Sequence, residues 1–114
     1  MSLDEAVGAL IDAIVYASPG TAPDGIDPPY CIYARITTAP DNTLDATPIS
    51  EHVRFQVDVH AKTYGQARGL CQSIKAAIGA SALGGYVLDD RMVFEDAVKL
   101  HRCIIDYAVR ATLA

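Results

Sequence analysis

The segment from Glu51 to Ala61 alternates regularly between polar and apolar residues. Its apolar members are Val53, Phe55, Val57, Val59 and Ala61, and its polar members are His52, Arg54, Gln56, Asp58 and His60. Successive side chains of a β-strand point to opposite faces, so this strand has one apolar and one polar face. Such a strand fits an antiparallel sheet packed on one side, and it argues against a parallel sheet that is covered on both faces.

Two other segments have the spacing of amphipathic helices. Ser2–Glu5 and Thr63–Gln66 each have the form of a capping box, which marks a helix start. Behind each of them, apolar residues recur every three or four positions. The pattern predicts one helix from about Leu3 to Ala17 and a second from about Tyr64 to Ile78, where Gly79 favours an end.

Further strands are indicated by runs of β-forming residues. They are expected at Tyr30–Ile36, at Leu100–Ala111, and as two short pieces at 86–88 and 92–95, with a turn at 89–91 between them. The resulting order is α-β-β-α-β-β over a single domain, residues 1–114. It predicts an α+β fold in which a mainly antiparallel sheet carries both helices on its apolar face.

Two segments are predicted to be loops. Ser18–Pro29 contains four prolines and two glycines and reads as a turn-rich surface loop. Thr37–Ser50 has two prolines and no apolar period, and its length is unusual for a connection in so small a domain. It is interpreted either as a functional loop or as a long hairpin loop without a task.

Charge and composition exclude several classes of function. The net charge is −5, and the nine basic residues are scattered, which argues against recognition of nucleic acids or anionic membranes. No apolar stretch is long enough to span a bilayer, and the acidic start does not resemble a signal peptide, so synthesis in the cytoplasm is expected. Cys31, Cys71 and Cys103 fall in apolar patterns, which favours small buried residues over a reactive thiol.

No catalytic or cofactor-binding motif is found in the sequence. Neither a nucleophile elbow nor a glycine-rich phosphate loop occurs, so we expect neither an enzyme nor a cofactor. His52 and His60 share one strand face with Asp58, and an i, i+2 His/carboxylate pair can hold a divalent metal. A site needs at least three converging ligands, however, and His101 is far away in the sequence. A solvated strand face is the simpler interpretation, and no metal is expected.

The polar sheet face also carries apolar residues. Ile104 and Ala108 fall on it, together with either Tyr30, Ile32 and Ile36 or Cys31 and Tyr33 from the strand before. A sheet face can simply meet water, but a mixture of apolar and charged residues is also what a subunit interface presents. The pattern therefore favours a self-assembling protein.

Four segments together resemble the tail-completion proteins of long-tailed phages, also called tail terminators. They are Pro29–Tyr33, with the form P-Y-x-x-Y, the strand Phe55–Ala61, the helix start Thr63–Arg68, and the last strand His101–Tyr107. The similarity covers about Leu3 to Arg110 in the family's order. One departure is His60, where the family pattern has a large aromatic residue.

The resemblance implies a structural virion protein that forms a ring, expected to be a hexamer, at the head-proximal end of the tail. Its implied partners are copies of itself, the major tail tube protein and a head-completion protein. The candidate contact residues are Arg54, Asp58 and Asp106 on the polar strand face and Asp41, Asn42, Leu44 and Asp45 in the long loop. A head-to-tail connector, a minor tail subunit and a small-molecule-binding or enzymatic domain remain as alternatives.

Overall fold

The computed structural model describes residues 3–21, 25–42, 48–81 and 85–112. In this part of the chain the elements are α1 (Leu3–Asp12), β1 (Ala17–Pro19), β2 (Tyr30–Asn42), β3 (Pro48–Ala61), α2 (Tyr64–Ala80), β4 (Tyr86–Glu95) and β5 (Leu100–Thr112). The predicted order is confirmed, with β1 as one additional short strand. No described helix is long and apolar enough to cross a membrane.

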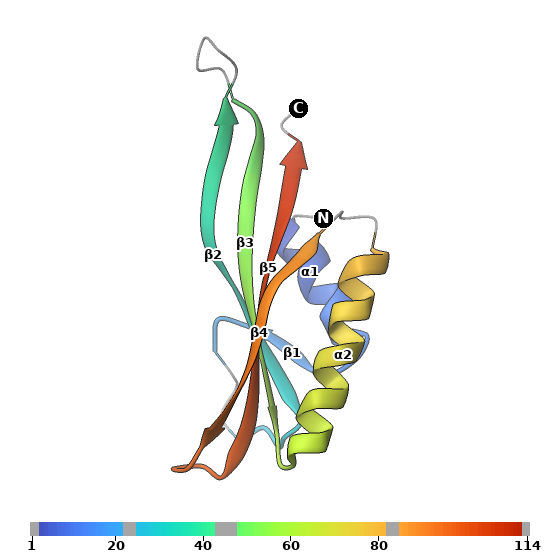
Figure 1. The fold of residues 1–114 in the computed structure, drawn as a ribbon, viewed down its shortest axis with the longest axis vertical. Coiled ribbons are helices and arrows are strands. Elements are labelled where there is room, and N and C mark those ends of the chain that lie inside the picture. Colours follow the sequence, from blue (N-terminus) through green and yellow to red (C-terminus); the bar gives the residue numbers. More distant parts are fainter. Residues whose placement is uncertain (1–2, 22–24, 43–47, 82–84, 113–114) are drawn as a thin grey trace.

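The described strands form one sheet in the order β1-β2-β3-β5-β4. β3 lies at its centre and pairs antiparallel with β2 and β5, and β4 pairs antiparallel with β5. Only β1 runs parallel to its neighbour β2. Figure 1 shows both helices on the same side of the sheet. The predicted α+β fold with a mainly antiparallel sheet is therefore confirmed.

The core lies between the helices and the apolar face of β3. Val53, Phe55, Val57 and Val59 are at most 1% exposed. They share one cluster with three fully buried helical residues, Ile11, Ile74 and Ile78, while Leu10, Ile14 and Leu70 pack at its border. From β5, Tyr107 stacks on Phe55 with ring centroids 5.5 Å apart. The alternating residues of β3 thus lie in the core on one face of the strand and outside it on the other, as predicted.

Strand register decides which residues of β2 face the helices. Cys31 and Tyr33 pair with the buried Val59 and Val57, so they lie on the helix side, and the residues between them lie on the other face. The Tyr33 ring packs directly against α1 at Gly8. A Cβ atom at Gly8 would overlap the Tyr33 hydroxyl group, so any larger residue there would force the ring to move.

The prediction of a first helix up to Ala17 is wrong beyond Asp12. The Asp12 carboxylate accepts a hydrogen bond from the Ala17 backbone N–H at 3.0 Å, and the chain turns there. Residues 17–19 then pair with Cys31–Tyr33 as β1. Ile14 and Val15 still pack on the core, which explains why their spacing imitates a continuing helix.

The predicted loop Thr37–Ser50 is wrong over most of its length. β2 continues to Asn42 and β3 begins at Pro48, and their backbones pair throughout. A register shift between Arg35 and Thr37 interrupts the side-chain alternation, so this half of the hairpin leaves no regular apolar period. Backbone pairing with β3, rather than an apolar pattern, extends the strand.

The predicted turn at Asp89–Arg91 is also wrong. These residues lie within β4 and pair with β5, and the register shifts between Val87 and Asp89. The extra residue of this bulge, Leu88, breaks the alternation that would have marked one continuous strand.

The second helix begins where the capping box predicts. The Thr63 side chain accepts a hydrogen bond from the Gln66 backbone N–H at 3.1 Å, and α2 runs from Tyr64 to Ala80. This contact satisfies one of the donors left unpaired at a helix start.

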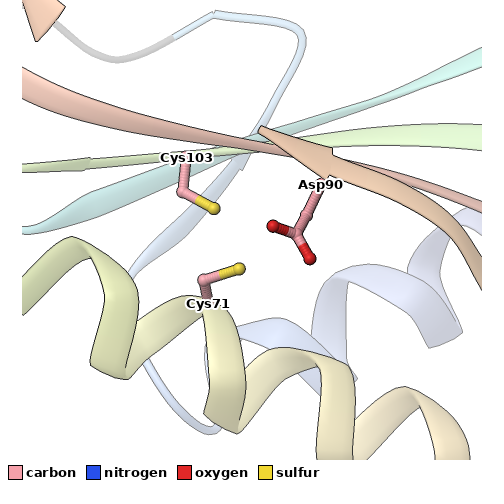
Figure 2. A group of neighbouring side chains, drawn as sticks. All are labelled: Cys71, Asp90 and Cys103. Carbon is pink, nitrogen blue, oxygen red and sulfur yellow. The ribbon is translucent and has the colours of Figure 1, made fainter. Parts of the chain in front are cut away.

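Charged contacts tie α2 to β4. Asp90 accepts hydrogen bonds from Lys75 at 2.6 Å and from Arg68 at 2.9 Å, and these bonds hold the pKa of its carboxyl below the ordinary value. Beside Asp90 lie Cys71 from α2 and Cys103 from β5, both fully buried (Figure 2). Burial raises the pKa of the Cys103 thiol to about 12. Together with Cys31, these thiols are buried as predicted.

We predict that Phe55→Ala lowers the free energy of unfolding by about 3–5 kcal/mol, because the ring is removed from a closely packed core. The matched control is Phe94→Ala, since Phe94 is 49% exposed and should cost less than about 1 kcal/mol. Chemical denaturation of both variants measures the difference. Equal costs would mean that Phe55 does not lie in a closely packed core.

We predict that Asp90→Asn lowers stability by roughly 1–3 kcal/mol, because two charge-assisted hydrogen bonds are weakened. Since the folded pKa of Asp90 is depressed, its contribution is present above the unfolded pKa of about 3.9 and is lost as pH falls through the folded pKa. The control is Asp96→Asn, which breaks an exposed pair with Lys99. Melts from pH 7 to pH 2 should show the variant losing less stability than the parent protein.

Candidate interaction surface

The face of the sheet opposite the helices is termed here the open face. Strand register assigns to it Tyr30, Ile32 and Ala34 of β2, Arg54, Gln56, Asp58 and His60 of β3, Arg102, Ile104, Asp106 and Ala108 of β5, and Tyr86, Asp89, Arg91 and Val93 of β4. Of the two sequence-based alternatives for β2, the one with Tyr30 and Ile32 is therefore correct. Charged and apolar residues alternate across this surface.

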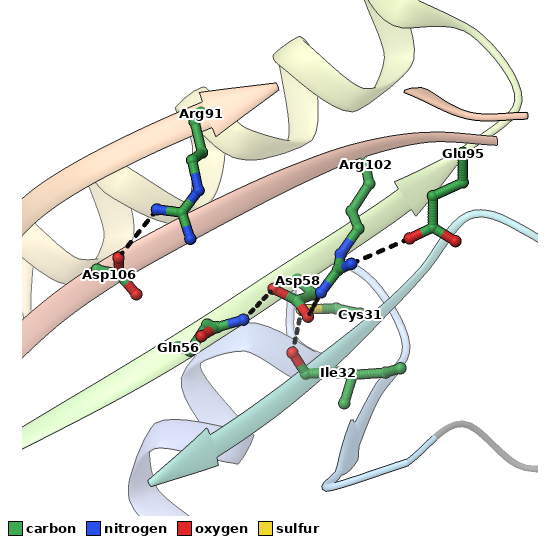
Figure 3. Close-up of polar contacts among 8 residues, drawn as sticks. All are labelled: Cys31, Ile32, Gln56, Asp58, Arg91, Glu95, Arg102 and Asp106. Carbon is green, nitrogen blue, oxygen red and sulfur yellow. Dashed lines mark hydrogen bonds and ion pairs between the residues drawn. The ribbon is translucent and has the colours of Figure 1, made fainter. Parts of the chain in front are cut away.

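Asp58 is the centre of a hydrogen-bonded network on the open face. It accepts from Arg102 at 2.6 Å and from Gln56 at 3.1 Å, and Arg102 also donates to Glu95 at 3.0 Å (Figure 3). The Asp58 side chain is only 13% exposed. These contacts hold the charges in a fixed arrangement across β3, β5 and β4.

His60 packs beside this network. Its ring stacks on Tyr30 with centroids 4.8 Å apart. His60 stands where the family pattern has a large aromatic residue, and its imidazole makes this ring contact instead. Two effects lower the pKa of His60: burial of its ring is the larger, and the positive charge of the nearby Arg102 is the smaller. The neutral imidazole acts here as a packed ring.

Neither candidate group of metal ligands suits a cation. Asp58 already binds the Arg102 guanidinium, and for His52 the structure describes the backbone alone. Cys71, Asp90 and Cys103 bring their ligand atoms within 4.8 Å of one another. However, both carboxylate oxygens of Asp90 face cationic groups, so a metal ion would have to displace two ion pairs.

Arg54 and Asp106 lie near each other on the open face. Both line a cleft of about 540 Å³ with Tyr86, Leu88 and Ala108. Arg54 is exposed, and Asp106 accepts a hydrogen bond from Arg91 at 3.3 Å. Asp58 lies farther along β3, so the three predicted strand residues occupy one surface.

The predicted contact residues of the long loop are placed differently. Asp41 and Asn42 form the last two positions of β2, next to the register shift that precedes Pro48. Leu44 and Asp45 lie outside the described residues.

Sequence reasoning missed the exposed apolar edge of the sheet. Tyr86, Leu88, Val93 and Phe94 of β4 are each at least 40% exposed. The only signal for them was a run of β-forming residues, which the assumed turn at Asp89–Arg91 divided into two short strands.

A solved structure supports the fold independently. A chain of the virion of a native gene transfer agent particle has 16% sequence identity to this chain and a TM-score of 0.63. The match covers 97% of this chain and 87% of that one. No curated protein matches the sequence.

The sequence also matches a family model over nearly its whole length. The matching family is described as tail completion protein gp17, and the match spans residues 2–112. The resemblance noted on the strand and helix motifs is thereby confirmed, and the protein's location is the virion tail. The chain belongs to the tail completion protein gp17 family of phage tail proteins.

Proposed function

We propose that copies of this chain form a ring on the head-proximal end of a phage tail tube. The ring ends polymerisation of the tube and prepares it for joining to the head. Family membership supports a structural role in the tail, and the open face is the observation that carries the proposal. Ile32 is half-buried on this face and lies among charged groups, as in the core and rim of a subunit interface, while Ile104 beside it is buried.

The charges of the open face are suited to meeting another protein. Asp58, Arg102 and Glu95 are already held in one geometry, so their side chains lose little conformational freedom on binding. A neighbouring subunit that excluded water would strengthen the electrostatic interactions of Arg54 and Asp106 with opposite charges. This surface would therefore orient a bound protein and would not catalyse a reaction.

A closed ring needs a heterologous interface, in which two different patches of each subunit meet. The mechanism is binding and steric blocking of the tube end, without turnover and without a cofactor. The expected partners are further copies of the chain, in a hexamer, the major tail tube protein and a head-completion protein. A head-to-tail connector or minor tail subunit would share this surface but bind elsewhere in the particle.

A small-molecule site is less well supported. One cleft of about 580 Å³ is lined in part by Asp4, Tyr33, Arg35 and Phe55. Arg35 donates to Asp4 at 3.0 Å and lies over the Phe55 ring, so the charged groups of the cleft already satisfy each other. A binding site would leave such groups available to a ligand.

We predict that the purified protein forms closed rings, alone or on tail tubes, and that it stops tube growth. Electron microscopy of tubes assembled with and without the protein shows whether tubes become capped at one end and shorter. A protein that stays monomeric by light scattering and leaves tube length unchanged would contradict the function proposed here.

We predict that Arg54→Glu weakens ring formation or capping at least tenfold while the melting temperature changes by no more than a few degrees. Arg54 is exposed on the open face, so the domain loses no described ion pair. The control is Lys62→Glu, which makes the same charge change at an exposed position beyond the end of β3. Equal capping by both variants would remove Arg54 from the interface.

Asp58→Lys is a less selective test. Asp58 binds Arg102, and a lysine there would leave two cations facing each other at a partly buried position. We expect that variant to lose fold stability as well as assembly.

A further inference from the structure

The sheet ends in two uncovered strand edges that differ from each other. On one side, β4 pairs with β5 and has no other described strand beside it. On the other side, β1 covers β2 only at Cys31–Tyr33, so no described strand pairs with the outer edge of β2 from Ala34 onward. An uncovered edge presents backbone donors and acceptors to any strand that can reach it.

The directions of the strands make these two edges compatible. β2, β3, β5 and β4 follow one another through three antiparallel pairings, so β4 runs opposite to β2. A second copy, rotated about an axis along the strands, therefore presents its β2 antiparallel to this β4. Joining the copies in this way continues the antiparallel order of the strands from one copy to the next.

The register indicates which halves of the edges meet. Across the paired strands, Ala34 lies level with Asp89, whereas Ile32 lies level with Arg91. Because β1 occupies the edge of β2 at Ile32, the part of β4 that finds an open edge is Tyr86–Asp89. Its counterpart on the next copy is the part of β2 that begins at Ala34.

The side chains at these two positions are complementary. Leu88 is the extra residue of the β4 bulge and is 43% exposed, and Tyr86 is 54% exposed. Ile36 lies at the register shift of β2, is 51% exposed, and lines a cleft of about 190 Å³. The apolar Ile32 and Ala34 form its wall on β2, and Gly20, Gln56 and Asp58 complete it. Proteins often protect an edge strand with Pro or with charged side chains, above all Lys. β4 contains neither Pro nor Lys, and its charged residues are paired within the domain: Asp89, Asp90, Arg91 and Glu95.

We infer that β4 of one subunit adds, through Tyr86–Asp89, to the edge of β2 beyond Tyr33 in a second copy of the same chain. Main-chain hydrogen bonds would provide the binding, and Leu88 against the cleft at Ile36 would select the register. This inference rests on the proposed ring and names the surfaces by which its subunits join. Since the two edges differ, the contact is heterologous and propagates from copy to copy.

Cysteine cross-linking with a short bis-maleimide tests this contact, on the protein alone and on tail tubes. The double variant Leu88→Cys with Ile36→Cys should give a ladder of products that extends beyond the dimer. Each single variant should give no covalent dimer or larger product, because the natural cysteines are buried and unreactive. The matched control is Val93→Cys with Ile36→Cys, since Val93 lies level with Tyr30, and it should give no ladder.

A charge at the edge gives a second test that does not depend on cross-linking. Leu88→Lys should abolish ring formation, whereas Val98→Lys, at a 57% exposed position between β4 and β5, should leave it intact. Both variants are exposed substitutions, and circular dichroism confirms whether they remain folded.

The outcomes separate this inference from the proposed function. If the parent protein caps tubes but the Leu88–Ile36 double variant stops at the dimer, gives no ladder, or cross-links no better than the Val93 control, strand addition is wrong and the ring stands. The same holds if Leu88→Lys still closes rings. If the parent protein neither forms rings nor caps tubes, the proposed function fails first.

Discussion

The burial of one face of β3 is the constraint on which the rest of the structure depends. β3 pairs along both edges, so its backbone polar groups are satisfied within the sheet. Its apolar row, from Val53 to Val59, is at most 1% exposed beneath the two helices. With both helices on that side, the other face of the same strand has no helix to cover it, and its polar residues come to lie together on the open face.

The charged side chains of the open face are held in place by contacts between strands. Arg102 reaches across from β5 to bind Asp58 of β3 and Glu95 of β4, so three strands contribute to one charged cluster. A comparable cluster at Asp90, on the helix side, attaches α2 to β4. Through these two sets of contacts the edge strand β4 is held from both faces of the sheet.

The two edges of the sheet are unequal because β1 is short. Three residues of β1 cover β2 at Cys31–Tyr33. Within the part of the chain that the structure describes, no strand pairs with the outer edge of β2 from Ala34 onward or with the outer edge of β4. An even number of antiparallel strands from β2 to β4 sets the two edges in opposite directions. Copies related by rotation about an axis along the strands would therefore present β2 antiparallel to β4, and this relation follows from the topology of the sheet.

The sequence by itself determined those features that depend on neighbouring residues. Alternation in Glu51–Ala61 defined the core face, the capping residue Thr63 located the start of α2, and together the elements identified the fold class. The motifs at Pro29–Tyr33 and Phe55–Ala61 identified the family, which in turn indicated a tail protein. Arg54, Asp58 and Asp106 were placed on the correct face because strand periodicity alone assigns it.

Only the tertiary structure decided where the strands end and which residues meet. The extension of β2 to Asn42, the pairing of β1, and the continuity of β4 through Asp89 all depend on backbone hydrogen bonds to a distant strand. Such bonds involve groups common to every residue and leave no mark in the side-chain pattern. The Asp58–Arg102 pair joins strands that are distant in the sequence, and the exposed edge at Leu88 depends on which strand is outermost. Both therefore appear only once the sheet has formed.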